Sequence, residues 1–276
     1  MRSTDEPTRN GGRARGVTSR EIDRRQALRL LGAAGVSSVA LGACRGSDGA
    51  EDSLPAGTSS GSSTTAAPVV GTGPVTADMF KSATACSLTP EQTEGPYYID
   101  VDRIRSDIRE DRQGIPLRLA ARVMDVDGCT PVKDAVFEVW HCDAGGLYSG
   151  FEQASQGRGG PRGGSAGTDQ TRYLRGAQVT NGEGIAVITT IYPGWYQGRT
   201  VHIHAKVQLT NAKALTTQLY LDDKLTDEVY AKAPYSSHQG RRTLNGDDNI
   251  YPRETTLTVS KETDGYLGLI TMGISA

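Results

Sequence analysis

The sequence lacks an excess of charge, a long apolar run and many aromatic residues, and each absence excludes a class of protein. Its 276 residues include 30 Lys and Arg against 32 Asp and Glu, a formal net charge of −2. This balance argues against a nucleic-acid partner. Hydrophobic residues make up 36% of the chain, aromatic residues only 6%, and glycines number 34. The composition fits one globular domain with a polar portion and is not that of an integral membrane protein.

The longest uncharged apolar stretch lies near the N-terminus, from Leu30 to Ala43, directly after a basic run. These 14 residues, at about 1.5 Å each, span roughly 21 Å, short of the ~30 Å hydrocarbon core of a membrane. We therefore interpret residues 1–43 as an export signal. Arg24 and Arg25 resemble a twin-arginine signal, and the sequence up to Cys44 resembles a lipoprotein box, which would place a lipid anchor on that cysteine. The mature protein is then expected to be extracellular or anchored to the outer face of the cell membrane.

Residues 44–78 are rich in Ser, Thr, Gly, Ala and Pro, with too little apolar surface to order themselves. They are predicted to form a disordered tether, followed by one folded domain over 79–276. If Cys44 carries lipid, Cys86, Cys129 and Cys142 remain. In an oxidising compartment these three allow one disulfide and one free thiol, and the sequence leaves the pairing open.

Short β-rich runs separated by turn signals dominate the chain from Leu117 onward, and long amphipathic helices are absent. This pattern predicts an all-β fold, a two-sheet antiparallel β-sandwich with irregular loops around a metal site. Leu225 and Val229, four residues apart between strand runs, predict one short helix. The predicted strands are 117–126, 135–141, 173–180, 184–191, 200–209, 216–221, 255–260 and 266–273.

The candidate chemistry concentrates at His202 and His204. Residues two apart on a strand project to the same face, so both imidazoles can bind one metal ion from a rigid element. An isolated pair of this kind is more often two half-exposed histidines, so a metal site is predicted only if other residues can complete the set of ligands. His238 lies in a loop without a partner at ligand spacing, which predicts a surface position. His141 follows the alternation of its strand, which predicts a core histidine.

Tyrosines at strand ends are the best further candidates. Tyr148 follows the run 135–141, and both Tyr192 and Tyr196 precede the histidine strand. A phenol in water has a pKa near 10, so ligation as phenolate requires a strongly acidic cation. Ferric iron fits better than zinc or ferrous iron, because hard anionic oxygen favours the higher charge.

Several ordered motifs between about Cys86 and the C-terminus resemble the intradiol ring-cleavage dioxygenases of the catechol and protocatechuate type. These are non-haem iron(III) enzymes that open catechols between the two hydroxylated carbons. The motifs that carry the resemblance are Thr93-Glu-Gly-Pro-Tyr97, Trp140-His-Cys-Asp143, Gly146-Leu-Tyr148-Ser149, Leu174-Arg-Gly-Ala-Gln-Val-Thr180, Thr190-Ile-Tyr-Pro-Gly-Trp-Tyr-Gln-Gly-Arg199, His202-Ile-His204 and Thr217-Gln-Leu-Tyr220.

The resemblance implies a role for each candidate residue. It selects Tyr196 over Tyr192 as a ligand, because the family places this tyrosine after Pro-Gly, and it gives Tyr196 a second role in taking a proton from the substrate. Arg199 would stand on the opposite face of a regular strand from His202, unless a bend at Gly198 turns it inward. The implied iron ligands are Tyr148, Tyr196, His202 and His204; the implied catalytic residues are Tyr196, Arg199 and Gln218; and the implied substrate contacts are Gly95, Pro96 and Arg199.

The function implied is an exported iron(III) intradiol dioxygenase, with 79–276 as its catalytic domain. It would convert a small aromatic diol and O₂ to a muconate-type diacid. Two alternatives stay open: a secreted β-sandwich binding module without chemistry, and a zinc hydrolase built on His202 and His204. The second lacks an Asp, Glu or Cys at ligand spacing. The preferred catechol and the oligomeric state are left open.

Overall fold

The computed structural model describes residues 71, 73–80, 86–101, 103–155, 169–209, 214–240 and 242–276. The predicted export signal 1–43, Cys44 and most of the predicted tether 44–78 lie outside the described residues. Within the described part of the chain, no helix combines the length and the apolar character needed to cross a membrane.

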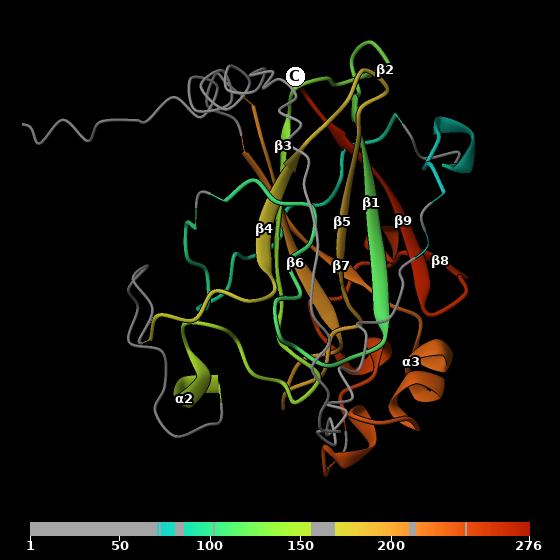
Figure 1. The fold of residues 1–276 in the computed structure, drawn as a ribbon. Coiled ribbons are helices and arrows are strands. Elements are labelled where there is room, and N and C mark those ends of the chain that lie inside the picture. The colour runs from blue at the N-terminus through green and yellow to red at the C-terminus, as the bar shows by residue number, and fades with distance from the viewer. Residues whose placement is uncertain are drawn as a thin grey trace, which may run out of the picture. The chain divides into compact units, whose positions relative to one another are not determined.

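The described residues form two β-sheets packed face to face, as the sequence predicted (Figure 1). One sheet has five strands, in which β1 pairs with β2 and β5 along one edge and with β9 along the other, and β8 pairs with the far edge of β9. The second sheet has the order β4-β3-β6-β7. The strand bounds are β1 Pro116–Asp125, β2 Thr130–Pro131, β3 Val136–Trp140, β4 Arg175–Val179, β5 Ile185–Ile191, β6 His202–Gln208, β7 Ala214–Tyr220, β8 Thr258–Lys261 and β9 Tyr266–Ile274.

One strand pair departs from the antiparallel prediction. β1 and β9 run parallel, with Leu117 opposite Tyr266 and Asp125 opposite Ile274. Parallel neighbours need a long crossover, and the chain between these two strands includes most of the domain. The last predicted strand before β9 also begins later than expected, because Arg253–Thr255 form the short 3₁₀ helix η4 before β8.

The described α-helices, α2 and α3, lie beside one end of the sheets (Figure 1). The predicted helix is present as α3 (Asp223–Tyr230), and Asp222 caps it by accepting hydrogen bonds from the amides of the next turn. Among the described residues the other α-helix is the single turn α2 (Glu152–Ser155). The remaining 3₁₀ turns are η1 Ala77–Met79, η2 Tyr235–Ser237 and η3 Asn245–Asp247.

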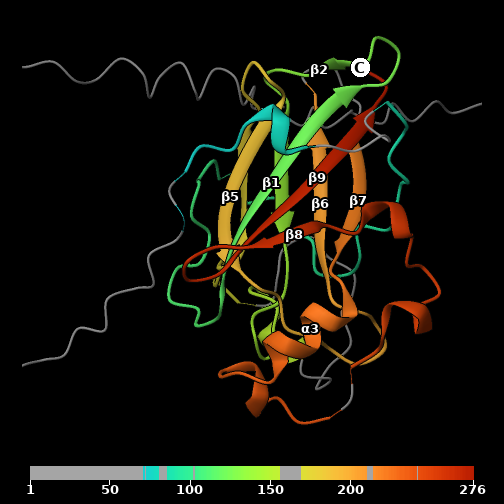
Figure 2. The same cartoon turned by 90° about the vertical axis from the view of Figure 1, so that its right-hand side faces the viewer.

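The side chains of strand β6 alternate between the hydrophobic core and the polar outer face of the sheet. Ile203, Ala205 and Val207 are fully buried in the core that also contains Leu119 and Ile188 of the other sheet. In Figure 2 the sheet containing β1, β5, β8 and β9 stands in front of β6 and β7. The intervening residues of β6, beginning with His202, point away from this core, as alternation predicts.

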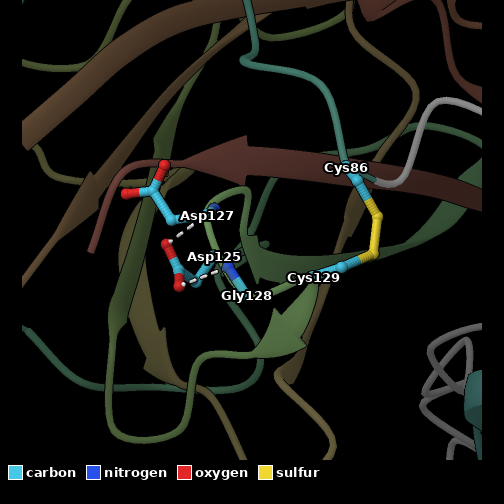
Figure 3. Close-up of a disulfide and its surroundings, with 5 residues drawn as sticks. All are labelled: Cys86, Asp125, Asp127, Gly128 and Cys129. Carbon is cyan, nitrogen blue, oxygen red and sulfur yellow. Dashed lines mark hydrogen bonds between the residues drawn. A yellow bond between two sulfur atoms is a disulfide. The ribbon is translucent and has the colours of Figure 1, made fainter.

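Residues 86–98, here called the covering segment, start at the turn between β1 and β2, pass β9 and, from Gln92 onward, run over the outer face of the β4-β3-β6-β7 sheet. A disulfide between Cys86 and Cys129 attaches the start of the segment to the turn between β1 and β2 (Figure 3). The Thr89 amide donates to the Gly273 carbonyl at 2.9 Å, and the Gln92 amide to the Thr216 carbonyl at 2.8 Å. Among the described residues Cys142 is a free, buried thiol, so the pairing left open by the sequence is resolved.

Residues 73–80 span the predicted boundary between tether and domain and pack on the other sheet. Phe80 is buried against Ala120 and Leu267. Arg118 donates to the carbonyls of Gly71 and Gly73. This part of the chain therefore has a defined position on the sandwich.

Candidate metal and substrate site

The site is built on one row of residues that crosses the β4-β3-β6-β7 sheet. Arg175, Trp140, His204 and Gln218 stand directly opposite one another on the four adjacent strands. All four side chains face away from the hydrophobic core, and each residue is at most 1% exposed. The covering segment thus buries a polar row on the outer face of a sheet.

The two histidines are adjacent, neutral and oriented. The Nε2 atoms of His202 and His204 lie 3.2 Å apart. Burial lowers the pKa of His202 to about 3 and that of His204 well below its usual 6.5. The His202 Nδ1 donates to the Thr200 carbonyl at 2.6 Å, which leaves Nε2 with its lone pair free. His204 is held from the side by the Trp140 ring, stacked at 5.0 Å.

Two phenols meet the histidines. The Tyr196 hydroxyl lies 3.1 Å from His202 Nε2. The Tyr148 ring lies 5.8 Å from that of Tyr196 and 6.1 Å from that of His204, between ring centres. The Tyr148 hydroxyl is buried and has no hydrogen-bond partner in the described structure. Burial raises the pKa of both phenols. Leaving a buried hydroxyl such as that of Tyr148 without a hydrogen bond costs on the order of 1–3 kcal/mol.

The chemistry of these four side chains fits a ferric ion. The structure brings the predicted ligands Tyr148, Tyr196, His202 and His204 together, with two phenol oxygens and two imidazole nitrogens. Two phenolates would offset much of a 3+ charge, and a cation beside the Tyr148 oxygen would satisfy that orphaned atom. In the described part of the chain no three His, Cys, Asp or Glu side chains gather as they do in ordinary zinc sites.

The competing phenol, Tyr192, is not part of this group. Its hydroxyl hydrogen-bonds the Thr226 hydroxyl at 2.7 Å, and its ring packs in the core. His141 is also a core residue, 1% exposed, with its Nε2 2.7 Å from the Thr190 hydroxyl. The surface position predicted for His238 is wrong, because this residue is half-buried and stacks on Trp195 at 4.3 Å.

Gly95 lies directly over His204. Its φ is +75°, and a Cβ built at this position would come within 2.9 Å of the His204 ring carbon Cε1. Only glycine combines this backbone conformation with so close an approach. Pro96 follows it in the covering segment and is exposed. The glycine therefore forms a wall of the site, while Pro96 is at the surface.

The covering segment is joined to the site's strands by side chains on both sides. The Glu94 carboxylate pairs with Lys206 of β6 at 2.5 Å. Gln218 of β7 donates from its side-chain amide to the Thr93 carbonyl at 2.9 Å, and its backbone amide donates to Gln92 Oε1 at 3.2 Å. The segment is thus fixed to both strands that carry the site.

A bend brings Arg199 to the same face as the histidines. Gly198 has a φ of +91°, a left-handed conformation that favours glycine. The Arg199 guanidinium then donates from Nη2 to Gln218 Oε1 at 2.6 Å and from Nε to Asp248 at 2.9 Å. The sequence made Arg199 and Gln218 candidate catalytic residues, but no pattern in it indicated Asp248.

Arg175 is the second site residue without a predicted role. It is 1% exposed, and burial lowers its pKa to about 10. Its guanidinium donates to the Ser149 carbonyl at 2.7 Å and to the Ser149 hydroxyl at 2.9 Å. Since Ser149 follows Tyr148, this buried arginine holds the backbone of a candidate ligand. Its place in the motif 174–180 was the available signal.

The fold and this constellation define a β-sandwich protein with a buried group of two tyrosines and two histidines. A family model described as "Dioxygenase" matches residues 92–244. An intradiol ring-cleavage dioxygenase from Tetranychus urticae is 34% identical, with a TM-score of 0.63, and the match covers 68% of this chain and 94% of that one. The chain belongs to the intradiol ring-cleavage dioxygenase family.

More distant relatives agree with this assignment. The dioxygenase domain of a dioxygenase carbohydrate-binding protein fusion from Streptomyces sp. SirexAA-E is 26% identical with a TM-score of 0.52, over 68% of this chain and 99% of that chain. A chlorocatechol 1,2-dioxygenase of Cupriavidus pinatubonensis is 33% identical over 148 residues, 49% of this chain and 56% of the relative. The chain spans about half the length of the curated relatives it matches.

Proposed function

We propose that the protein opens catechol-type aromatic diols with O₂ between the two hydroxylated carbons, giving muconate-type diacids. The observation that carries this proposal is the convergence of Tyr148, Tyr196, His202 and His204 in a member of this family. These four residues would hold Fe³⁺. A ferric ion there would draw electron density from a bound catecholate and make its ring carbon reactive toward O₂.

The two tyrosines have different tasks. Burial raises the pKa of Tyr196, while the positive charge of Arg199 acts to lower it. Because its pKa is raised, Tyr196 would be a strong base when a ferric ion holds it as phenolate, and it could then take up a proton from the incoming diol. The Tyr148 hydroxyl is buried completely and has no hydrogen-bond partner in the described structure, so Tyr148 would be the permanent oxygen ligand.

The residues around the ligands bind and shield the substrate. Arg199 stabilises negative charge that develops on the ring, and Gln218 holds its guanidinium. Gly95, with Pro96 behind it, places the covering segment over His204 and keeps bulk water from that side.

We also propose that the protein is exported and works outside the cytoplasm. Residues 1–43 act as the signal, the part of 44–78 that precedes the packed residues 73–80 acts as the tether, and Cys44 carries a lipid. The disulfide between Cys86 and Cys129 supports this location, because such bonds persist mainly in oxidising compartments. Mass spectrometry of the mature protein tests the proposal: a chain that retains Met1 and an unmodified Cys44 would refute both export by cleavage and lipidation.

Oxygen uptake is the direct test of the enzyme function. Iron-replete protein should consume one O₂ per catechol and release a muconate. Phenolate-to-iron charge transfer should also colour the pure protein above roughly 400 nm. Colourless iron-loaded protein refutes tyrosine ligation, and coloured protein without oxygen uptake refutes the dioxygenase activity. Metal analysis that finds zinc and no iron would favour a hydrolase instead.

A further inference from the structure

A loop beyond the region matched by the family model holds the corner that precedes β6. Asn245 at the start of this loop donates from its side-chain amide to the Leu221 carbonyl at 2.9 Å. Its side-chain oxygen accepts from the Thr200 hydroxyl at 2.7 Å. The loop 245–250 is therefore tied both to the end of β7 and to the corner 198–200.

Asp248 occupies the centre of this loop and is almost fully buried, with 3% of its side chain exposed. Its Oδ2 accepts from the Thr200 amide and from Arg199 Nε, both at 2.9 Å, and its Oδ1 accepts from the Ile250 amide at 3.1 Å. Burial acts to raise the pKa of Asp248, but the two amides and the guanidinium together lower it. The group is therefore a carboxylate.

The contacts of Arg199 leave one nitrogen available. Nε is bound to Asp248, and Nη2 is bound to Gln218 Oε1 at 2.6 Å and approaches the Tyr220 hydroxyl at 3.3 Å. The described residues provide no hydrogen-bond acceptor for Nη1. A planar guanidinium fixed at two nitrogens has no remaining rotation, so the direction of the third is set.

We propose that Asp248 is a positioning residue that fixes the Arg199 guanidinium beside His204, with Nη1 as the donor left for the substrate. This inference rests on the proposed function only for the identity of that substrate. Gln218 alone would hold one nitrogen and allow the group to rotate about that contact. The carboxylate supplies the second fixed point and the opposite charge that keeps the arginine in place.

Asp248→Asn is the informative substitution, with Asp247→Asn as its matched control. Asparagine keeps the size and one acceptor oxygen, but it loses the charge, and its amide nitrogen must face one of the three N–H donors. Asp247 is exposed in the same loop, and its side chain has no hydrogen bond in the described structure. Asp248→Asn leaves at least one of these donors without its acceptor but keeps the size and shape of the side chain, and Asp247→Asn removes no hydrogen bond that the described structure shows, so both should fold.

The expected kinetic result separates positioning from metal binding. Asp248→Asn should lower kcat/KM by roughly ten- to a hundredfold, as expected for loss of a hydrogen bond to a charged group, and kcat more than KM. Iron content and the visible spectrum of the resting protein should not change. Asp247→Asn should match the wild type. Loss of iron in Asp248→Asn, or unchanged kinetics, would overturn the proposal.

A double-mutant cycle tests whether Asp248 acts through Arg199. In the Arg199→Ala background, Asp248→Asn should cause no further loss, because the group it positions is gone. A further tenfold loss would mean that Asp248 acts through another group, and the proposal would fall.

Crystal structures of the two variants make the test independent of activity. In Asp248→Asn the Arg199 guanidinium should leave Gln218 or lose its ordered density, and in Asp247→Asn it should stay. An unmoved guanidinium in Asp248→Asn contradicts the proposal. If the wild type consumes no O₂ with catechol, the proposed function fails, whereas these structures still decide whether Asp248 fixes Arg199.

Discussion

Gly95→Ala tests the idea that the covering segment closes directly on a candidate metal ligand. The new methyl carbon would lie 2.9 Å from His204 Cε1, closer than non-bonded carbons approach. The ring is held by stacking on Trp140 at 5.0 Å with an interplanar angle of 6°, which limits its movement. The backbone at this position has a φ of +75°, which an alanine adopts only with strain.

The magnitude follows from these two effects. A left-handed conformation costs a residue with a Cβ about 1–2 kcal/mol, and overpacking a rigid contact costs about 1–3 kcal/mol. Gly95→Ala should therefore lower the free energy of unfolding by about 2–5 kcal/mol. If the covering segment lifts from the sheet, the loss is smaller, but the surroundings of His204 open and the visible spectrum of iron-loaded protein shifts.

Urea unfolding together with the visible spectrum measures both outcomes. Gly182→Ala is the control, since a Cβ at that glycine meets no atom within 4 Å. It should stay within about 1 kcal/mol of the wild type, the usual scale of an exposed glycine change. A Gly95→Ala variant with wild-type stability and an unchanged spectrum would refute the contact between the covering segment and His204.

Three further changes test other parts of the site and fold. Tyr148→Phe should lower iron occupancy and shift the colour, whereas Tyr196→Phe should keep iron and slow turnover; metal analysis and stopped-flow spectra decide, and unchanged turnover in both variants would break the assignment. Replacing both disulfide cysteines by serine should lower the free energy of unfolding by about 4 kcal/mol, the loop-closure value for a separation of 43 residues, and adding reductant should then have no further effect. For metal-free protein, stability should fall as the pH drops from 6.5 towards 3, because unfolded His202 binds a proton at a pKa near 6.5 while the folded residue holds it off until about 3. The total is at most about 5 kcal/mol, and a flat unfolding profile over this range would contradict the burial of that ring.

The sandwich and the face of the histidines were predictable because both follow from local alternation. Ile203 and Ala205 enter the core and His202 and His204 leave it, as a regular strand requires. The parallel pairing of β1 with β9 was not predictable in this way, since the alternating pattern of a strand does not reveal the direction of its neighbour. The position of His238 depends on stacking against Trp195, a contact between segments distant in sequence.

Motifs predicted the residues of the candidate site, but they did not predict how Arg199 and Asp248 are held there. The alternation of side chains along a regular strand would put Arg199 on the opposite face from His202, and the left-handed backbone at Gly198 brings it to the same face. Asp248 lies in a turn-rich loop where an aspartate ordinarily faces water. Its burial depends on the docking of that loop against the corner before β6, which no short-range pattern encodes.

The placement of the histidines on β6 restricts how the length of this chain can change. Because successive side chains of the strand alternate between the candidate metal site and the hydrophobic core, inserting or deleting one residue within it would exchange the two sets. Imidazoles would enter the apolar interior while isoleucine and alanine faced the tyrosines. Variation in length among descendants of this sequence should therefore fall in the connecting loops and spare the strand itself.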